Sequence, residues 1–261
     1  MAQNMKIYSW NILYRNRDLN AAFEFISHAD FDVFCLQEVT EGFLKRLQTL
    51  PYHCAFRTDV ERILPQGVVR NYVVTLSKYP IIRQGEIPFP EYWSHLPLRT
   101  RIFVRLMPSR YFSKIRNRGG LFVDIAREES TVRVFNLHLI LAHPAWRLRE
   151  FELAMAEHDP LRPAIVCGDL NTLERPHIGL LNWILGGRVG DALFYNRERI
   201  HIEKRFVVHE LTNAFAGEVT HTLSRSQLDH ILVSHSLAIK NTTVIPERYG
   251  SDHHPLCVEI A

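Results

Sequence analysis

Six short stretches of this 261-residue sequence combine a strand-like apolar run with side chains that can bind a metal ion or transfer a proton. They are SWNIL with Asn11, CLQEV with Glu38, FNLHL with His138, CGDLNT with Asp169 and Asn171, QLDHILVS with Asp229, and GSDHHPL with Asp252 and His253. The apolar residues suffice to make a strand, so the polar ones need another explanation. Loops at the strand ends of an α/β fold converge on a common cleft, and we expect these side chains to meet there.

Taken singly, most of these residues have a simpler interpretation. Asn11 is typical of a turn, and Glu38 suits a solvated strand end. His138 suits a core position with its ring nitrogens bonded. Asp229 is harder to explain in this way, because the ILV that follows it indicates a buried strand, where a lone carboxylate is costly. One shared cleft is a more economical explanation than independent turns at four or five strand ends.

A shared cleft would crowd carboxylates together. The four acids concerned are Glu38, Asp169, Asp229 and Asp252. Like charges that close cannot all stay ionised unless a cation intervenes. Mg²⁺, or Mn²⁺ as a substitute, suits carboxylate and amide oxygens, and no HExxH or Cys-pair pattern favours zinc. A hard cation beside imidazoles is suited to hydrolysing a phosphate ester, because it offsets the charge that builds on the phosphoryl oxygens. A carboxylate can then take the proton of the attacking water.

The same stretches, in this order along the chain, resemble the endonuclease/exonuclease/phosphatase superfamily. That superfamily includes pancreatic-type deoxyribonucleases, abasic-site endonucleases, sphingomyelinases and inositol-polyphosphate phosphatases. The matching segments run from Asn11 to Pro255 in the family's order. The resemblance implies a four-layer α/β/β/α sandwich, with two packed mixed β-sheets flanked by helices, and Mg²⁺-dependent phosphoester hydrolysis.

The resemblance also implies the metal ligands. Glu38 is the principal ligand in this interpretation, assisted by Asn11 and Asp252. Some members carry an acid two residues after the first Asn, whereas this chain has Leu13, which weakens the expectation of two fully protein-bound metals. His254 is expected to be structural, because it points to the opposite face of an extended segment.

The remaining roles carried over from the family are catalytic. Asp169 resembles the carboxylate that orients or deprotonates water, and Asn171 the amide that holds a phosphate oxygen. His253 resembles the histidine that polarises the phosphate, and Asp229 the acid that orients a catalytic histidine. His138 resembles the histidine that deoxyribonuclease and sphingomyelinase branches use near the leaving group.

The apolar patterns predict the elements that must position these residues. Helical spacing predicts helices over 18–29, after Thr40, around Phe151, and over 177–185. Short β-rich runs predict strands at 6–12, 32–39, 52–59, 71–78, 81–89, 119–126, 132–140, 163–171, 227–235, 239–245 and 255–261. No linker-like stretch or internal repeat interrupts them, so residues 1–261 are expected to form a single domain.

Composition places the chain among ordinary globular proteins, with 46% hydrophobic and 23% charged residues. A formal charge of +3 tolerates an anionic partner without demanding one. Four cysteines without a CxxC pair favour a reducing compartment. The N-terminus turns polar too soon for a signal peptide, and no run is long enough to span a bilayer, so we expect a cytoplasmic protein without a transmembrane segment.

The basic stretch over 99–119, RTRIFVRLMPSRYFSKIRNRG, has no acidic residue. Alternation in its first half predicts a strand with a basic face, and the later part is predicted to be a loop. The candidates for substrate binding are Arg101, Arg105, Tyr111 and Arg116. The stretch is either a solvated face, a contact for a nucleic-acid backbone, or an anchor at an anionic lipid surface.

Two kinds of function therefore remain open. The first is a hydrolase whose phosphate-ester substrate is a nucleic acid or a phospholipid or phosphoinositide head group. The alternative is a catalytically weak or inactive member that only binds nucleic acid or anionic lipid. The complete set of acids and histidines favours the hydrolase.

Overall fold

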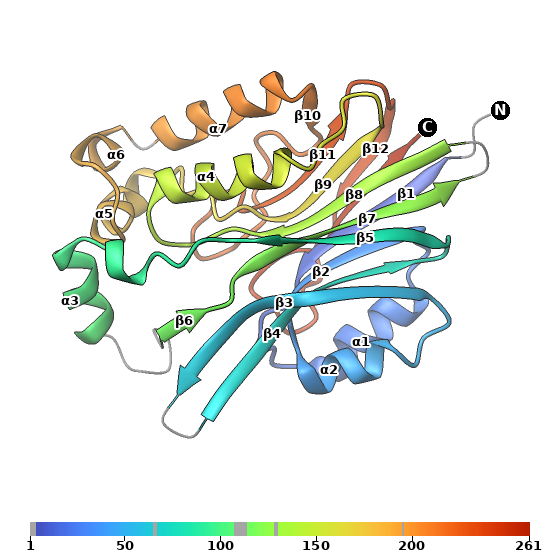
Figure 1. Ribbon diagram of the computed structural model, residues 1–261, viewed down its shortest axis with the longest axis horizontal. Coiled ribbons are helices and arrows are strands. Elements are labelled where there is room, and N and C mark those ends of the chain that lie inside the picture. The colour runs from blue at the N-terminus through green and yellow to red at the C-terminus, as the bar shows by residue number, and fades with distance from the viewer. Residues whose placement is uncertain (1–3, 65–66, 107–113, 128–129, 195) are drawn as a thin grey trace.

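The computed structural model describes residues 4–64, 67–106, 114–127, 130–194 and 196–261. Two mixed β-sheets pack face to face, and helices cover the outer face of each (Figure 1). This arrangement confirms the predicted four-layer α/β/β/α sandwich.

The first sheet is mixed, because β1 and β2 run parallel while the other described pairs run antiparallel. In spatial order its strands are β12 (Ile239–Val244), β13 (Leu256–Ile260), β1 (Met5–Asn11), β2 (Val33–Thr40), β4 (Gly67–Ser77), β3 (His53–Leu64) and β6 (Lys114–Arg116).

The second sheet is also mixed, with β8 and β9 parallel and the other described pairs antiparallel. In spatial order its strands are β10 (Leu211–Asn213), β11 (Asp229–Ser234), β9 (Ala164–Asp169), β8 (Ser130–His138), β7 (Gly119–Arg127) and β5 (Ile81–Pro88).

The core between the sheets comes from alternate residues of facing strands. Ile7 and Val33 of the first sheet share one buried cluster with Val134 and Ile165 of the second. Successive side chains of a strand point to opposite faces, so every second residue can join this core. Burying each such side chain stabilises the fold by about 1.5–3 kcal/mol. The packing therefore fixes how the strand ends of one sheet stand against those of the other.

Helices bury their apolar stripes on the outer faces. On the first sheet lie α1 (Leu19–His28) and α2 (Glu41–Leu47), and on the second lie α4 (Pro144–Met155) and α7 (Arg197–Val208). Helix α1 starts at Asp18, whose carboxylate accepts a hydrogen bond from Ala21 N at 2.9 Å.

Four short elements gather at one end of the molecule (Figure 1). They are η1 (Trp93–His95), α3 (Leu98–Leu106), α5 (Pro176–Ile184) and α6 (Val189–Leu193). Side chains of α3 bind the end of α5, where Arg99 Nε donates to Trp183 O at 2.9 Å and Thr100 Oγ1 to Ile184 O at 2.8 Å.

The strand predicted in the first half of the basic stretch is wrong, because residues 98–106 form α3. Thr100 is buried against α5, while Leu98, Ile102 and Leu106 are exposed at i, i+4 and i+8 spacing. So short a segment fits both periods, and the contacts with α5 select the helix. The loop predicted for the later part is also partly wrong, because it contains β6. Tyr111 lies outside the described residues.

The sequence analysis also missed α7. Its buried Ile202 and Phe206 have helical spacing, but six Arg, Lys and Glu side chains from Arg197 to Arg205 mask the pattern. All four cysteines are free thiols. Among the described residues, no helix is long and apolar enough to cross a membrane.

Candidate active site

A cavity of about 570 Å³ lies where strands of both sheets end. Its polar end is lined by six of the predicted residues, namely Glu38, His138, Asp169, Asn171, Asp252 and His253. Glu38 and Asp252 come from opposite ends of the chain, yet they face the same cavity. The convergence expected from the sequence is therefore present.

Three neighbouring strands of the second sheet carry an acid or a histidine at matching positions. His138 of β8 pairs with Asp169 of β9, and Asp169 pairs in turn with Asp229 of β11. Gly168 permits this close approach, because its φ is +139° and a Cβ there would come within 1.8 Å of Leu137 O. The backbone thus sets these groups side by side.

Glu38 stands at an irregular point of β2. The pairing of β2 with β4 shifts register between Leu36 and Val39. The backbone of Glu38 has φ 57°, a left-handed value that residues other than glycine rarely adopt. Such a bulge changes the direction of a side chain, so that it no longer follows the regular alternation of the strand. The Glu38 carboxylate accepts a hydrogen bond from Tyr14 N at 2.9 Å.

A buried amide pair supports this bulge from the second sheet. Asn136 Nδ2 donates to Leu36 O at 3.2 Å and to Val74 O at 2.9 Å. Gln37 Nε2 donates to Asn136 Oδ1 at 2.8 Å. Because these groups are fully buried, losing one partner would leave the others unsatisfied.

Asn11 lies between Glu38, which it was expected to assist, and Asp169. Its Nδ2 is 3.0 Å from Asp169 Oδ2 and 3.5 Å from Glu38 Oε1, while its Oδ1 accepts from Leu13 N at 3.0 Å. In this arrangement Asn11 turns its amide nitrogen, not its oxygen, toward the acids.

His138 is oriented by Asp59, a residue that the sequence analysis did not select. The distance from His138 Nδ1 to Asp59 Oδ2 is 2.7 Å, which leaves Nε2 3.8 Å from both Glu38 Oε1 and Asp169 Oδ2. Burial by itself lowers the pKa of His138, but the Asp59 carboxylate, with Asp169 and Glu38, outweighs it and raises the pKa to about 9.

His253 forms a second pair of the same kind. Its Nδ1 lies 2.8 Å from Asp229 Oδ2, and Thr220 Oγ1 donates to the same oxygen at 2.8 Å. Its Nε2 is 3.9 Å from Asp169 Oδ2. Burial lowers the pKa of His253, yet Asp229, Asp169 and Asp252 raise it to about 10. A buried lone Asp229 would be costly, and this pairing explains its position.

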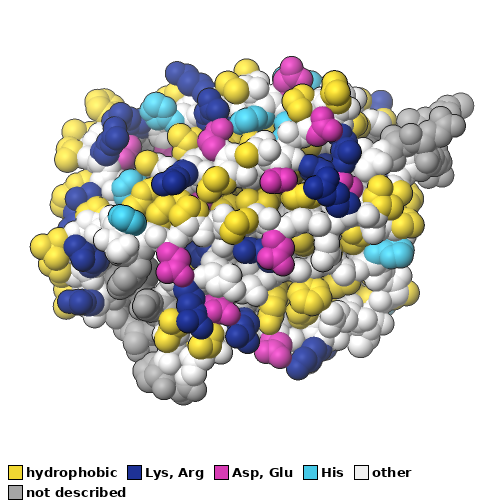
Figure 2. Space-filling model, viewed as in Figure 1, with side chains coloured by type: hydrophobic (Ala, Val, Ile, Leu, Met, Phe, Trp, Pro, Cys, Tyr) yellow, Lys and Arg dark blue, Asp and Glu magenta, His cyan; other side chains and the backbone are white. Residues whose placement is uncertain are grey.

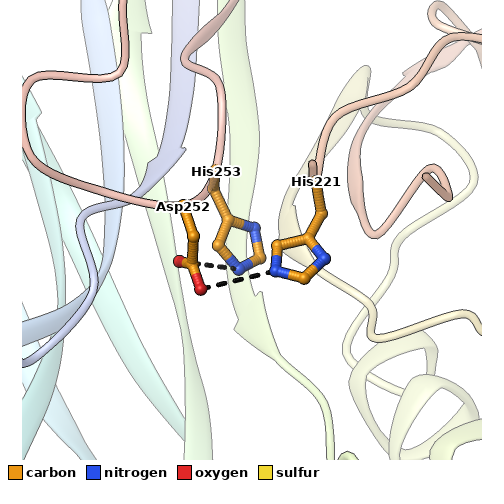
Figure 3. A group of neighbouring side chains, drawn as sticks. All are labelled: His221, Asp252 and His253. Carbon is orange, nitrogen blue, oxygen red and sulfur yellow. Dashed lines mark hydrogen bonds and ion pairs between the residues drawn. The ribbon is translucent and has the colours of Figure 1, made fainter. Parts of the chain in front are cut away.

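The Asp252 carboxylate lies beside two neighbouring imidazole rings, those of His253 and His221 (Figure 3). It points toward both rings, with 3.8 Å from Oδ1 to His253 Nε2 and 3.4 Å from Oδ2 to His221 Nε2. Burial raises the pKa of Asp252, but the hydrogen bond from His221 and the charge of His253 hold it below its usual value. The pKa of Asp169 is raised, because burial outweighs its histidine neighbours.

The polar end of the cavity fits a divalent cation. Oxygen ligands converge there from Glu38, Asp169 and Asp252, and Asp252 Oδ1 is buried without a hydrogen-bond partner among the described residues. His221, Asp252 and His253 place possible ligand atoms within 4.8 Å of one another, as do Asp169, Asp229 and His253. Carboxylate oxygens suit Mg²⁺, and the imidazoles also suit Mn²⁺ or zinc.

The candidates for substrate binding are only partly brought to this cavity. Arg116 lines it and donates to Glu61 Oε2 at 2.8 Å. Arg101 and Arg105 are exposed on α3 and do not line the cavity. His254 was expected to be structural, and its Nδ1 lies 2.9 Å from Ile245 O.

Two site residues, Asp59 and His221, were missed in the sequence. Asp59 interrupts the strand-like run YHCAFRTDV, which was the available signal. His221 lies in THTLSR, which has no strand pattern, and only the fold brings it next to Asp252.

Comparison with solved structures finds proteins that are similar to this chain in fold. An endonuclease/exonuclease/phosphatase from Beutenbergia cavernae has 16% identity and a TM-score of 0.71, covering 99% of this chain and 71% of that one. A mannosyl-6-phosphatase from Bacteroides thetaiotaomicron has 17% identity and a TM-score of 0.64, covering 98% and 99%. The human Nocturnin catalytic domain with bound sulfate has 17% identity and a TM-score of 0.63, covering 99% and 93%. At these identities the likeness shows a shared fold.

A search of curated proteins gives no significant match. The family model described as Endonuclease/Exonuclease/phosphatase family, in contrast, matches residues 8–253, which include every residue of the polar end of the cavity. The chain therefore belongs to the Endonuclease/Exonuclease/phosphatase family and is a phosphoester hydrolase.

Proposed function

We propose that this chain is a Mg²⁺-dependent phosphodiesterase in which water attacks phosphorus. One observation carries the proposal: Asp169 lies between two histidines, each oriented by its own buried carboxylate. His138 Nε2 and His253 Nε2 are 3.8 and 3.9 Å from Asp169 Oδ2, and their Nδ1 atoms are held by Asp59 and Asp229. A carboxylate base between two proton donors suits an in-line displacement that needs one proton removed and one supplied.

In this mechanism Asp169 takes the proton of the attacking water, a role that its raised pKa favours. His253 donates a hydrogen bond from Nε2 to a non-bridging phosphoryl oxygen. His138 supplies the proton that the leaving oxygen takes up. Asn171 donates one amide hydrogen to Leu139 O at 2.8 Å, which leaves its second hydrogen for a phosphate oxygen.

Glu38 and Asp252 would hold the divalent cation, with Asn11 beside them. When bound, the cation offsets the negative charge that builds on the phosphoryl oxygens. The left-handed backbone at Glu38 fits this role, because local strain of about 1–3 kcal/mol is found where function fixes a side chain.

The test is hydrolysis of bis(p-nitrophenyl) phosphate and of p-nitrophenyl phosphate before and after EDTA. We expect turnover of the diester to stop with EDTA and to return with Mg²⁺. Activity that chelation does not change contradicts the metal requirement, and turnover of the monoester alone contradicts the diesterase. Binding without turnover of any ester would favour the alternative binding module.

We also propose that residues 1–261 act as one domain. The buried cluster shared by both sheets, which contains Ile7 and Ile165, supports this proposal. A single calorimetric unfolding transition is expected, and two separable transitions would contradict it.

A further inference from the structure

The cavity has a second, apolar end beyond the catalytic histidines. Side chains of α3 and α5 line this end of the cavity. This apolar chamber is lined by Leu96, Phe103, Ile115, Ile140, Leu181 and Leu185. A cavity of about 570 Å³ exceeds what a phosphate and a metal need, and apolar lining binds apolar groups.

The arginines of the cavity wall do not suit an extended polyanion. Arg116 pairs with Glu61, Arg118 with Glu150, and Arg62 with the side chain of Asn71. Nucleic acids are bound mainly through unpaired basic groups on their phosphates. The chamber therefore favours a substrate with one phosphoester and a hydrocarbon part.

The outside of the chamber wall carries an exposed apolar stripe. On α3, Leu98, Ile102 and Leu106 are 66%, 48% and 81% exposed. Arg101 and Arg105 flank the stripe, and neither guanidinium makes an ion pair or hydrogen bond within the described part of the chain. Helix α3 has no acidic residue, and Figure 2 shows hydrophobic and basic side chains side by side at this end.

Nearby helix α6 extends this surface. Val189 and Leu193 are 63% and 70% exposed, and Phe194 directly after the helix is 62% exposed. An apolar stripe flanked by arginines matches a bilayer surface with anionic head groups.

Resting on the proposed function, we propose that the substrate is a lipid phosphoester drawn from an anionic membrane surface. The α3 stripe docks on the bilayer, and the hydrocarbon chain enters the apolar chamber. The phosphoester then lies at the polar end, next to His138 and Asp169.

Calorimetric titration with methyl, butyl and octyl phosphate in Mg²⁺ tests the chamber without relying on turnover. We expect the affinity to rise by about two- to four-fold for each added methylene. Leu181→Gln should reduce the ratio of octyl to methyl affinity. Leu180→Gln is the matched control, since Leu180 is the preceding residue of α5, is exposed and does not line the cavity.

Cosedimentation with vesicles of phosphatidylcholine and about 30 mol% phosphatidylserine tests the docking surface. The full chain should bind, and Ile102→Asp or the pair Arg101→Gln and Arg105→Gln should reduce binding by about ten-fold or more. Val208→Asp on α7 is the control, because Val208 is 60% exposed and lies on another helix.

Three results overturn the inference. They are equal affinity for methyl and octyl phosphate, tighter binding of adenosine monophosphate than of octyl phosphate, and no vesicle binding by the full chain. If the affinity series and vesicle binding appear but no ester is hydrolysed, the proposed function fails while the lipid specificity stands.

Discussion

The two ends of the cavity are held in opposite ways. At the polar end, two histidines are each held by their own buried carboxylate, in the Asp59–His138 and Asp229–His253 pairs. At the apolar end, α3 is held to α5 by a few hydrogen bonds, among them that of Thr100 to Ile184 O. Catalysis requires groups fixed to within a fraction of an ångström, whereas binding a hydrocarbon needs only shape and apolar surface. In the function proposed above, the sheets would therefore set the reaction and the helical end would set the substrate.

The largest effect on activity is expected from substitutions of the acids at the polar end of the cavity. Glu38→Gln and Asp169→Asn should each lower kcat/KM for bis(p-nitrophenyl) phosphate by roughly 1,000-fold or more, because each removes a charge used in the transition state. Circular dichroism should show an unchanged fold. Glu218→Gln, at an exposed acid, is the control and should keep wild-type rates. Near-normal rates in both site variants would place catalysis elsewhere.

The next effect concerns the orientation and charge of His138. Asp59→Asn should lower kcat by about 100-fold, because the ring loses the carboxylate that orients it. Asp59 also raises the pKa of His138, so the variant's histidine should lose its proton at lower pH than the wild-type value of about 9. The alkaline fall of kcat/KM, measured from about pH 6 to about pH 10, should therefore move toward neutral pH. An unmoved alkaline limb would show that His138 does not act as a proton donor.

The next effect is on the free energy of unfolding, which should fall by different amounts for substitutions at the two ends of the cavity. Asn136→Leu should lower the free energy of unfolding by about 3 kcal/mol, because it leaves Gln37 and two buried carbonyls unsatisfied. Thr100→Val should lower it by only about 1 kcal/mol. Urea denaturation measures both. A larger loss for Thr100→Val would mean that the helical end, and not the inter-sheet contact, is the more tightly held region.

The smallest effect is expected at the rim. Arg116→Gln should raise KM for the diester by about five-fold with little change in kcat, since an exposed charge contributes about 1 kcal/mol or less. Arg70→Gln is the matched control: Arg70 also pairs with Glu61, at 2.8 Å, but does not line the cavity. Equal effects of the two variants would mean that Arg116 acts only through Glu61.

The sequence identified most of the residues at the polar end of the cavity, because the signals that mark them are local. An acid or amide at the end of an apolar strand, as in CGDLN, stands out from a pattern that does not need it. Asp59 and His221 carried no comparable signal, and they reach the site only through the pairing of β3 with β4 and the packing of 221 against 253. At the helical end of the cavity, the alternation of basic and apolar residues led to the wrong prediction of a strand. Contacts with α5 determine that these nine residues form the helix α3.

The sequence by itself indicated most of the strands, the layered fold and most of the acids and histidines at the polar end of the cavity, because burial periodicity and residue chemistry are written in neighbouring positions. Only the tertiary structure decided which carboxylate orients which histidine, where Asn11 turns its amide, and that the cavity continues into an apolar chamber. Those facts depend on contacts between residues far apart in the chain, and no local pattern encodes the distance between two strands or the side of a helix that a neighbour covers.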